Sequence, residues 1–307
     1  MQVQIDVLEA TVLGAVQGLT EFLPISSRAH LILVPWLFGW PDPGLTFDVA
    51  LHLGTLIALL LYFIKDWIAL AVSALKLLNG DTRDTGARIA LYIILATIPA
   101  GIAGFFLERY EDQFSTPTVI AATLIGVGLL MRAAELSGLR TTDLEDITLA
   151  DSLTVGFAQA LAIIPGVSRS GVTITAGLFR NMTRSAAAQF SFLLSAPIVA
   201  GAVVKKVIDI AHEGLPSGQE LPFTVGIVVS AAFGLLSIAA LMHYLQTRST
   251  FIFIYYRIAL GIAVLILGYF SSLSSNYREV TKTERPPADH RSEIEERSRS
   301  TTPPFHP

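Results

Sequence analysis

Residues 21–31, EFLPISSRAHL, place a carboxylate, two hydroxyls, a guanidinium and an imidazole around one proline. The chain that surrounds this stretch is strongly apolar, because 52% of its 307 residues are hydrophobic and only 15% are charged. A soluble domain carries about 25% charged residues, so this chain lacks the polar surface that water requires. The contrast between the polar stretch and its surroundings indicates a membrane protein with a functional site at this stretch.

Long apolar runs give the fold class. Several of them approach the roughly 20 residues that a helix needs to cross a bilayer, and we therefore predict an all-α polytopic membrane protein with about six transmembrane helices. The segment between the first two runs, residues 65–88, is predicted to be a loop. The chain has no cysteine, which excludes disulfides, thiolate metal sites and cysteine nucleophiles. The runs are residues 45–64, 89–106, 118–131, 186–204, 223–242 and 251–270.

The polar stretch has a counterpart in the second half of the chain. Residues 14–28 are GAVQGLTEFLPISSR, and residues 156–170 are GFAQALAIIPGVSRS. The second copy has lost one residue relative to the first, and two similar amphipathic helices are the alternative explanation. The matched residues are Gly14 with Gly156, Gln17 with Gln159, Pro24 with Pro165, Ser27 with Ser168 and Arg28 with Arg169.

The topology indicates that the two copies are inverted, because three predicted spans separate them. Each copy breaks its helix at a proline, and irregular backbone at membrane depth survives only where protein or a water-filled cavity surrounds it. We therefore expect two re-entrant broken-helix segments related as an inverted repeat. The predicted organisation is one integral membrane domain, residues 1–275, with repeat halves at about 5–135 and 148–270. The charged, proline-containing tail, residues 276–307, is predicted to be disordered.

The first copy carries candidate acid–base chemistry. Gln17 and Glu21 are four residues apart and share a helix face, and an intramembrane carboxylate is a functional candidate by default. Ser26 and Ser27 precede His30 by four and three residues, and one of these serines is expected to cap the following helix. Glu21 is predicted to hold a divalent cation, and His30 to act as acid–base or to activate Ser27. Attack by serine, by histidine and by water all remain open.

The second copy, PGVSRSGVTIT at residues 165–175, resembles an anion cradle. A helix that starts there directs free N–H groups and its positive dipole end at the site. Arg169 supplies a planar charged fork that suits phosphate oxygens, although an arginine that reaches lipid headgroups is the alternative. Together the two copies suit hydrolysis of a phosphate ester or anhydride on a lipid carrier. The groups expected to line the cradle are Ser168, Ser170, Gly171 and Thr173, with Gln17 and Gln159 in support.

At QGLTEFLPISS, His30 and PGVSRSGVTIT the chain resembles the undecaprenyl-diphosphate phosphatase family, the bacitracin-resistance integral membrane phosphatases. The resemblance covers roughly residues 5–270. It implies removal of the terminal phosphate from a C55 isoprenyl diphosphate, aided by Mg²⁺ or Ca²⁺, which recycles the lipid carrier for cell-wall synthesis. It also implies a multi-pass protein of the bacterial cell (inner) membrane. The expected partners are the lipid substrate and membrane lipids, with no nucleic acid, and a homodimer is one of the oligomeric states left open. The residues implied to line the active site are Glu21, Ser27, His30, Ser168, Arg169, Ser170 and Thr173.

The chain departs from the family pattern at two places. Arg28 and Ala29 stand where the family usually has Thr-Gly. Arg28 is expected among the phosphate-binding residues, and the alternative is that its guanidinium crowds them. His52 stands where a glutamine is commoner and is expected to face the core, whereas Asp48 is kept as a second carboxylate for the cation. A lipid-phosphate flippase with the same anion site is the alternative function. The predicted catalytic residues are Glu21, Ser27, His30 and Arg169, and the predicted phosphate-binding residues are Ser26, Arg28, Ser168, Ser170, Gly171 and Thr173.

Overall fold

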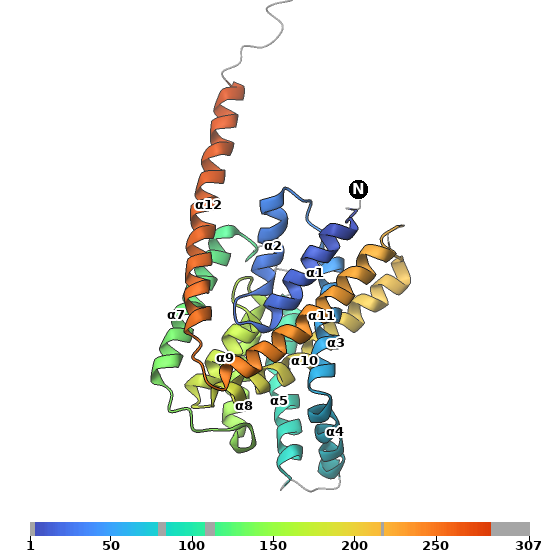
Figure 1. The fold of residues 1–307 in the computed structure, drawn as a ribbon, viewed down its shortest axis with the longest axis vertical. Helices are drawn as coiled ribbons and strands as arrows, with labels where there is room; N and C mark the ends of the chain where they lie inside the picture. The colour runs from blue at the N-terminus through green and yellow to red at the C-terminus, as the bar shows by residue number, and fades with distance from the viewer. Residues whose placement is uncertain (1–3, 79–83, 108–113, 216–217, 284–307) are drawn as a thin grey trace, which may run out of the picture. The chain divides into compact units, whose positions relative to one another are not determined.

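The computed structural model describes residues 4–78, 84–107, 114–215 and 218–283. These residues form eleven α-helices, so the predicted all-α class is confirmed (Figure 1). Residues up to Val264 make one compact unit. The helices are α1 (Val7–Phe22), α2 (Ser27–Phe38), α3 (Leu45–Tyr62), α4 (Ile64–Leu78), α5 (Thr85–Leu107), α7 (Pro117–Ser137), α8 (Leu149–Ala160), α9 (Arg169–Phe179), α10 (Arg184–Glu213), α11 (Glu220–Leu245) and α12 (Phe251–Thr283), with short 3₁₀ turns at Leu144–Asp146 and Leu161–Ile163.

Six helices are long and apolar enough to cross a membrane, as predicted: α3, α5, α7, α10, α11 and the first part of α12. The prediction of a loop at residues 65–88 was wrong, because α4 occupies most of it. α4 has Asp66 in its first turn and Lys76 in its last turn, where each charge interacts favourably with the helix dipole, whereas Lys65 in the first turn does not. The predicted tail begins at residue 276, inside α12. Residues 284–307 lie outside the described part, so the disorder of the tail stays a prediction.

Both predicted helix breaks are present. Pro24 lies between α1 and α2, and Pro165 lies between the 3₁₀ turn after α8 and the start of α9. Ser26 caps α2 by accepting a hydrogen bond from the Ala29 N–H at 3.4 Å. Ser168 caps α9 in the same way, from the Gly171 N–H at 3.1 Å.

The two caps correct the sequence alignment of the copies. Ser26 and Ser168 are the equivalent cap residues, so Ser27 occupies the first helical position in α2 that Arg169 occupies in α9. The match of Ser27 with Ser168 was therefore displaced by one position. The reason is that the second break has one more residue between its proline and its cap.

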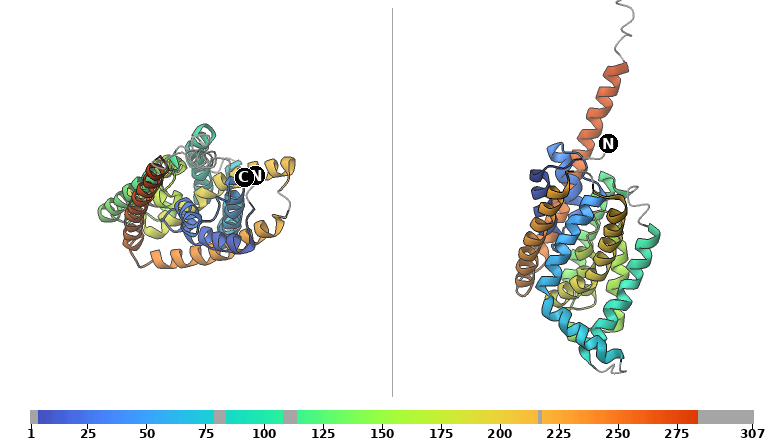
Figure 2. Two further views of the ribbon diagram at one scale, coloured as in Figure 1. Left: turned by 90° about the horizontal axis from the view of Figure 1, so that it is seen from above. Right: turned by 90° about the vertical axis from the view of Figure 1, so that its right-hand side faces the viewer.

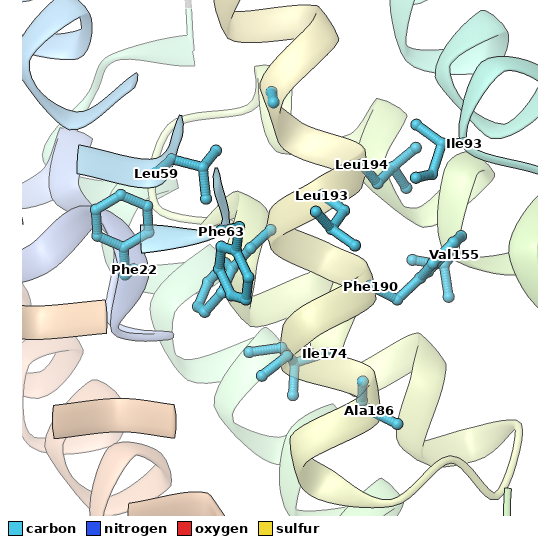
Figure 3. Packing of buried hydrophobic residues seen from close by; sticks show 14 of the residues in the cluster. Phe22, Leu59, Phe63, Ile93, Val155, Ile174, Ala186, Phe190, Leu193 and Leu194 are labelled. Atoms are coloured by element: carbon cyan, nitrogen blue, oxygen red, sulfur yellow. The ribbon is translucent and has the colours of Figure 1, made fainter. Parts of the chain in front are cut away.

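The largest hydrophobic core surrounds α10 and anchors both breaks (Figure 3). Phe22, the last residue of α1, packs edge-on against Phe192 with ring centroids 5.4 Å apart. Thr173 in α9 shares a hydrogen bond with Ser191, the neighbour of Phe192. One face of α10 thus fixes the end of the first break and the helix that follows the second.

Small residues let α1 lie directly against α11, which also packs along α3 (Figures 1 and 2). A Cβ atom on Gly14 would lie 2.7 Å from the Gly226 carbonyl oxygen and 3.2 Å from Val229 Cβ. Close backbone approach at glycines is a usual way to pack helices in lipid, where apolar side chains gain little from association.

Gly14→Val is expected to destabilise the protein by about 1–3 kcal/mol, the usual cost of overpacking. Gly126→Val in α7 is the matched control, since a Cβ there meets nothing within 4 Å. Thermal unfolding of both variants in detergent tests this, and equal melting temperatures would contradict the close α1–α11 contact.

Candidate active site

Glu21 forms the centre of the polar cluster. Its Oε2 accepts a hydrogen bond of 2.6 Å from the Ser27 hydroxyl and one of 3.1 Å from the Gln17 amide nitrogen. Glu21 and Gln17 lie on one face of α1, and Ser27 is the first residue of α2. The break at Pro24 therefore folds the start of α2 back onto the carboxylate at the end of α1.

The second break meets the first at this carboxylate. Arg169 at the start of α9 places Nη1 3.8 Å from Glu21 Oε1. The Ser170 hydroxyl lies 3.3 Å from the backbone oxygen of Glu21 and 3.1 Å from that of Leu23. The α1–α2 connection and the start of α9 also lie close together in Figure 1. Residues almost 150 positions apart in the chain thus share one polar cluster.

His52 was expected to face the core, and the structure contradicts this. Its Nε2 lies 3.6 Å from Glu21 Oε2, while its Nδ1 is 2.8 Å from the Asp48 carbonyl. A carbonyl only accepts, so Nδ1 carries hydrogen and Nε2 is the atom presented to the carboxylate. The sequence did contain a signal for this position, because His52 follows Asp48 by four residues and both are polar residues in an apolar span.

His30 does not bond Ser27. Its Nδ1 lies 2.7 Å from the Ser26 carbonyl, and its Nε2 lies 2.7 Å from the hydroxyl of Tyr256 in α12. The two rings are stacked with centroids 5.7 Å apart. Both ring nitrogens are therefore occupied, and Tyr256, which sequence reasoning missed, holds the imidazole in place.

Arg28 and Asp48 form an ion pair, with Nη1 2.6 Å from Oδ2. Asp48 is buried in the first turn of α3, and Arg28 is partly exposed. Binding of phosphate by Arg28 and of the cation by Asp48 stay predictions. In either role the side chain would have to contact the ligand as well as its ion-pair partner.

The residues of the predicted anion cradle are mostly buried around the first turns of α9. The Ser168 and Ser170 hydroxyls are 3.2 Å apart, and the Thr173 hydroxyl donates to the Arg169 carbonyl at 2.6 Å. Gln159, at the end of α8, is buried and neither of its side-chain polar atoms bonds any described residue. The structure joins it to none of the other predicted site residues.

The oxygen atoms around Glu21 fit a hard divalent cation. No three His, Asp or Glu side chains within the described ranges gather as a metal site. However, Mg²⁺ commonly uses one or two carboxylates with water and substrate phosphates. Gln17 turns its amide nitrogen toward Glu21, and its Oε1 is buried and accepts no hydrogen bond from any described residue. A carboxylate next to an unpaired amide oxygen suits such an ion.

Comparison with known proteins places the chain in a family. Residues 10–263 match the family model described as "Bacitracin resistance protein BacA". The chain is 51% identical over 261 residues to a protein named undecaprenyl-diphosphatase from Geobacter metallireducens, covering 84% of this chain and 97% of that protein. It is 50% identical over 266 residues to one of the same name from Moorella thermoacetica, covering 86% and 98%. The chain therefore belongs to the bacitracin resistance protein BacA family.

Proposed function

We propose that this chain is an undecaprenyl-diphosphatase, an integral membrane hydrolase that converts undecaprenyl diphosphate to the monophosphate and inorganic phosphate. The relatives that carry this name align with the chain over almost their whole length. Six helices of the described part are long and apolar enough to cross a membrane. The observation that carries the reaction is the 2.6 Å hydrogen bond from the Ser27 hydroxyl to Glu21, opposite Arg169. Recycling of the lipid carrier explains why such an enzyme belongs to a bacitracin-resistance family.

Ser27 is the nucleophile in this proposal and Glu21 is its base. The Ser27 oxygen attacks the terminal phosphorus while its proton passes to Glu21, and the bridging P–O bond breaks with its electron pair on the leaving lipid phosphate. After Glu21 has passed that proton to the departing lipid phosphate, water attacks the phosphoserine and gives its proton to Glu21. The Ser27 O–P bond breaks with its electron pair on the Ser27 oxygen, which takes the proton back from Glu21, and inorganic phosphate leaves. His30 is the less suitable partner for Ser27, because its nitrogens already contact Ser26 and Tyr256. Attack by water or by His30 would leave no phosphoserine in a single turnover.

Arg169 and the two helix starts stabilise the transferring phosphoryl group. The guanidinium of Arg169 lies beside Glu21 at the first turn of α9, where the free N–H groups and the helix dipole favour an anion. The Ser168 and Ser170 hydroxyls lie at the same turn, and Ser170 would donate to the phosphoryl group by exchanging its hydrogen bond to the Glu21 and Leu23 carbonyls. This arrangement places fixed positive charge and donors where negative charge develops.

A bound Mg²⁺ or Ca²⁺ would neutralise charge on the diphosphate oxygens. Glu21 and Gln17 Oε1 are the residues we propose to hold it, with Asp48 as a second carboxylate. Chelation is expected to lower activity strongly and reversibly.

We propose that the two breaks are re-entrant and that the halves, about 5–135 and 148–270, form an inverted repeat within one membrane domain of residues 1–275. The matched caps support this, as do the three candidate membrane spans, α3, α5 and α7, that the described residues place between the breaks. A homodimer also stays a prediction. A flippase would need the same anion site, but it has no use for a hydroxyl bonded to a carboxylate base.

The test is release of inorganic phosphate from undecaprenyl diphosphate by purified protein in detergent, with Mg²⁺, with Ca²⁺ and with chelator. We expect cation-dependent release with transient labelling of Ser27 from a substrate carrying radioactive terminal phosphate. Tight binding of the lipid without release, in folded protein, would contradict the hydrolase and favour the flippase.

A further inference from the structure

Arg257 is a completely buried arginine in α12 that takes no part in the proposed reaction. Among the described residues no carboxylate pairs with it, which is unusual because a buried charge is normally paired. Its guanidinium instead donates to backbone carbonyls. The bonds join Nη1 to Pro24 O at 3.2 Å, Nη2 to Gly166 O at 2.9 Å, to Val167 O at 3.0 Å and to Thr123 O at 3.3 Å, and Nε to Leu124 O at 3.3 Å.

Three of these carbonyls belong to the two helix breaks. Pro24 lies in the first break, and Gly166 and Val167 lie in the second, each just before the capping serine. Carbonyls that leave a helix at membrane depth need donors from the protein. One guanidinium therefore donates hydrogen bonds to backbone carbonyls of both breaks and, at the same time, to carbonyls of α7.

The backbone that follows these carbonyls is strained. Ser26 has φ of 76° and Ser168 has φ of 69°, in the region that residues other than glycine rarely adopt. Such conformations are energetically unfavourable and persist only where the surrounding structure enforces them. A Cβ on Gly171 would lie 2.9 Å from Arg257 Nη1, so the guanidinium also lies against the first turn of α9.

We propose that Arg257 is the positioning residue that sets the spacing of the two breaks and thereby holds Ser27, Glu21 and Arg169 in register. The catalytic consequence rests on the proposed phosphatase function, whereas the spacing role does not. Arg257 does not touch substrate, since its hydrogen bonds go to backbone and its side chain is buried. Lysine cannot replace it, because an ammonium donates from one point and the planar fork reaches both breaks at once.

The test compares Arg257→Lys with Arg140→Lys. Arg140 is the matched control, because its guanidinium also donates to helix carbonyls, those of Ala134 and Leu178, but away from the breaks. Hydrogen exchange of amides 25–29 and 167–171 is followed in detergent, well below the melting temperature. We expect exchange at both breaks to be at least about tenfold faster in Arg257→Lys and unchanged in Arg140→Lys.

Kinetics of the same proteins test the consequence for catalysis. For Arg257→Lys we expect kcat per folded molecule to fall about a hundredfold and inhibition by orthovanadate to weaken, which a mere loss of folded protein would not produce. Unchanged exchange at the breaks, or loss of activity that only follows melting temperature, would overturn the proposal. Failure of both Arg257→Lys and Arg257→Gln to fold, while Arg140→Lys folds, would assign Arg257 to general stability and overturn it too. If wild type releases no phosphate, the proposed function fails, and the exchange data still decide the role of Arg257.

Discussion

Glu21→Gln is expected to lower kcat for phosphate release about a thousandfold, within the range for loss of a general base. The amide keeps the size of the side chain but cannot take the proton of Ser27, whose hydroxyl lies 2.6 Å from Oε2. It also removes the negative charge that faces Arg169 and His52. Steady-state phosphate release at saturating substrate and cation measures the effect.

Glu9→Gln is the control for this variant. Glu9 is a carboxylate of the same helix, in the capping box with Asp6 at its start, and its loss is expected to leave kcat within about twofold. Activity of Glu21→Gln within tenfold of wild type would show that the carboxylate is not the base.

Arg169→Lys is expected to lower kcat/KM about 100- to 1000-fold, the usual loss for one preorganised group that stabilises developing charge. Lysine keeps the positive charge but loses the fork that contacts two oxygens of a phosphoryl group together. The variant therefore distinguishes the effect of the planar guanidinium from the effect of its positive charge. Melting temperature and kcat/KM are measured on the same preparation.

Arg180→Lys is the control for the loss of an arginine at one end of α9. Arg180 follows the other end of that helix, where its Nε bonds Asp151 at 2.6 Å, and we expect kcat/KM to stay near wild type. Equal losses in the two variants would mean that α9 responds to any such change and would remove the specific role of Arg169.

The spans and the breaks could be predicted from the sequence because each has a local cause. Apolar length predicts a span, and Pro24 and Pro165 interrupt helices wherever they lie. α4 was missed because its segment carries charges, which an amphipathic helix tolerates on one face.

The full site could not be predicted, because its remaining parts depend on tertiary contacts. Nothing near His30 in the sequence indicates that Tyr256 bonds its ring, and the contact of His52 with Glu21 depends on how α3 packs beside α1. The sequence did give an indication of Arg257, because it is the charged residue inside the predicted span 251–270. A charged side chain within a membrane span indicates a functional role.

The central claim is that the two breaks form one catalytic site, and a double-mutant cycle tests it most directly. Glu21→Gln, Arg169→Lys and the double variant are compared by kcat/KM for phosphate release from undecaprenyl diphosphate. Residues that act as a unit are strongly non-additive, so the double variant is expected to be at most about tenfold worse than the poorer single variant. Losses that simply multiply would show that the two residues act independently and would contradict a single shared site.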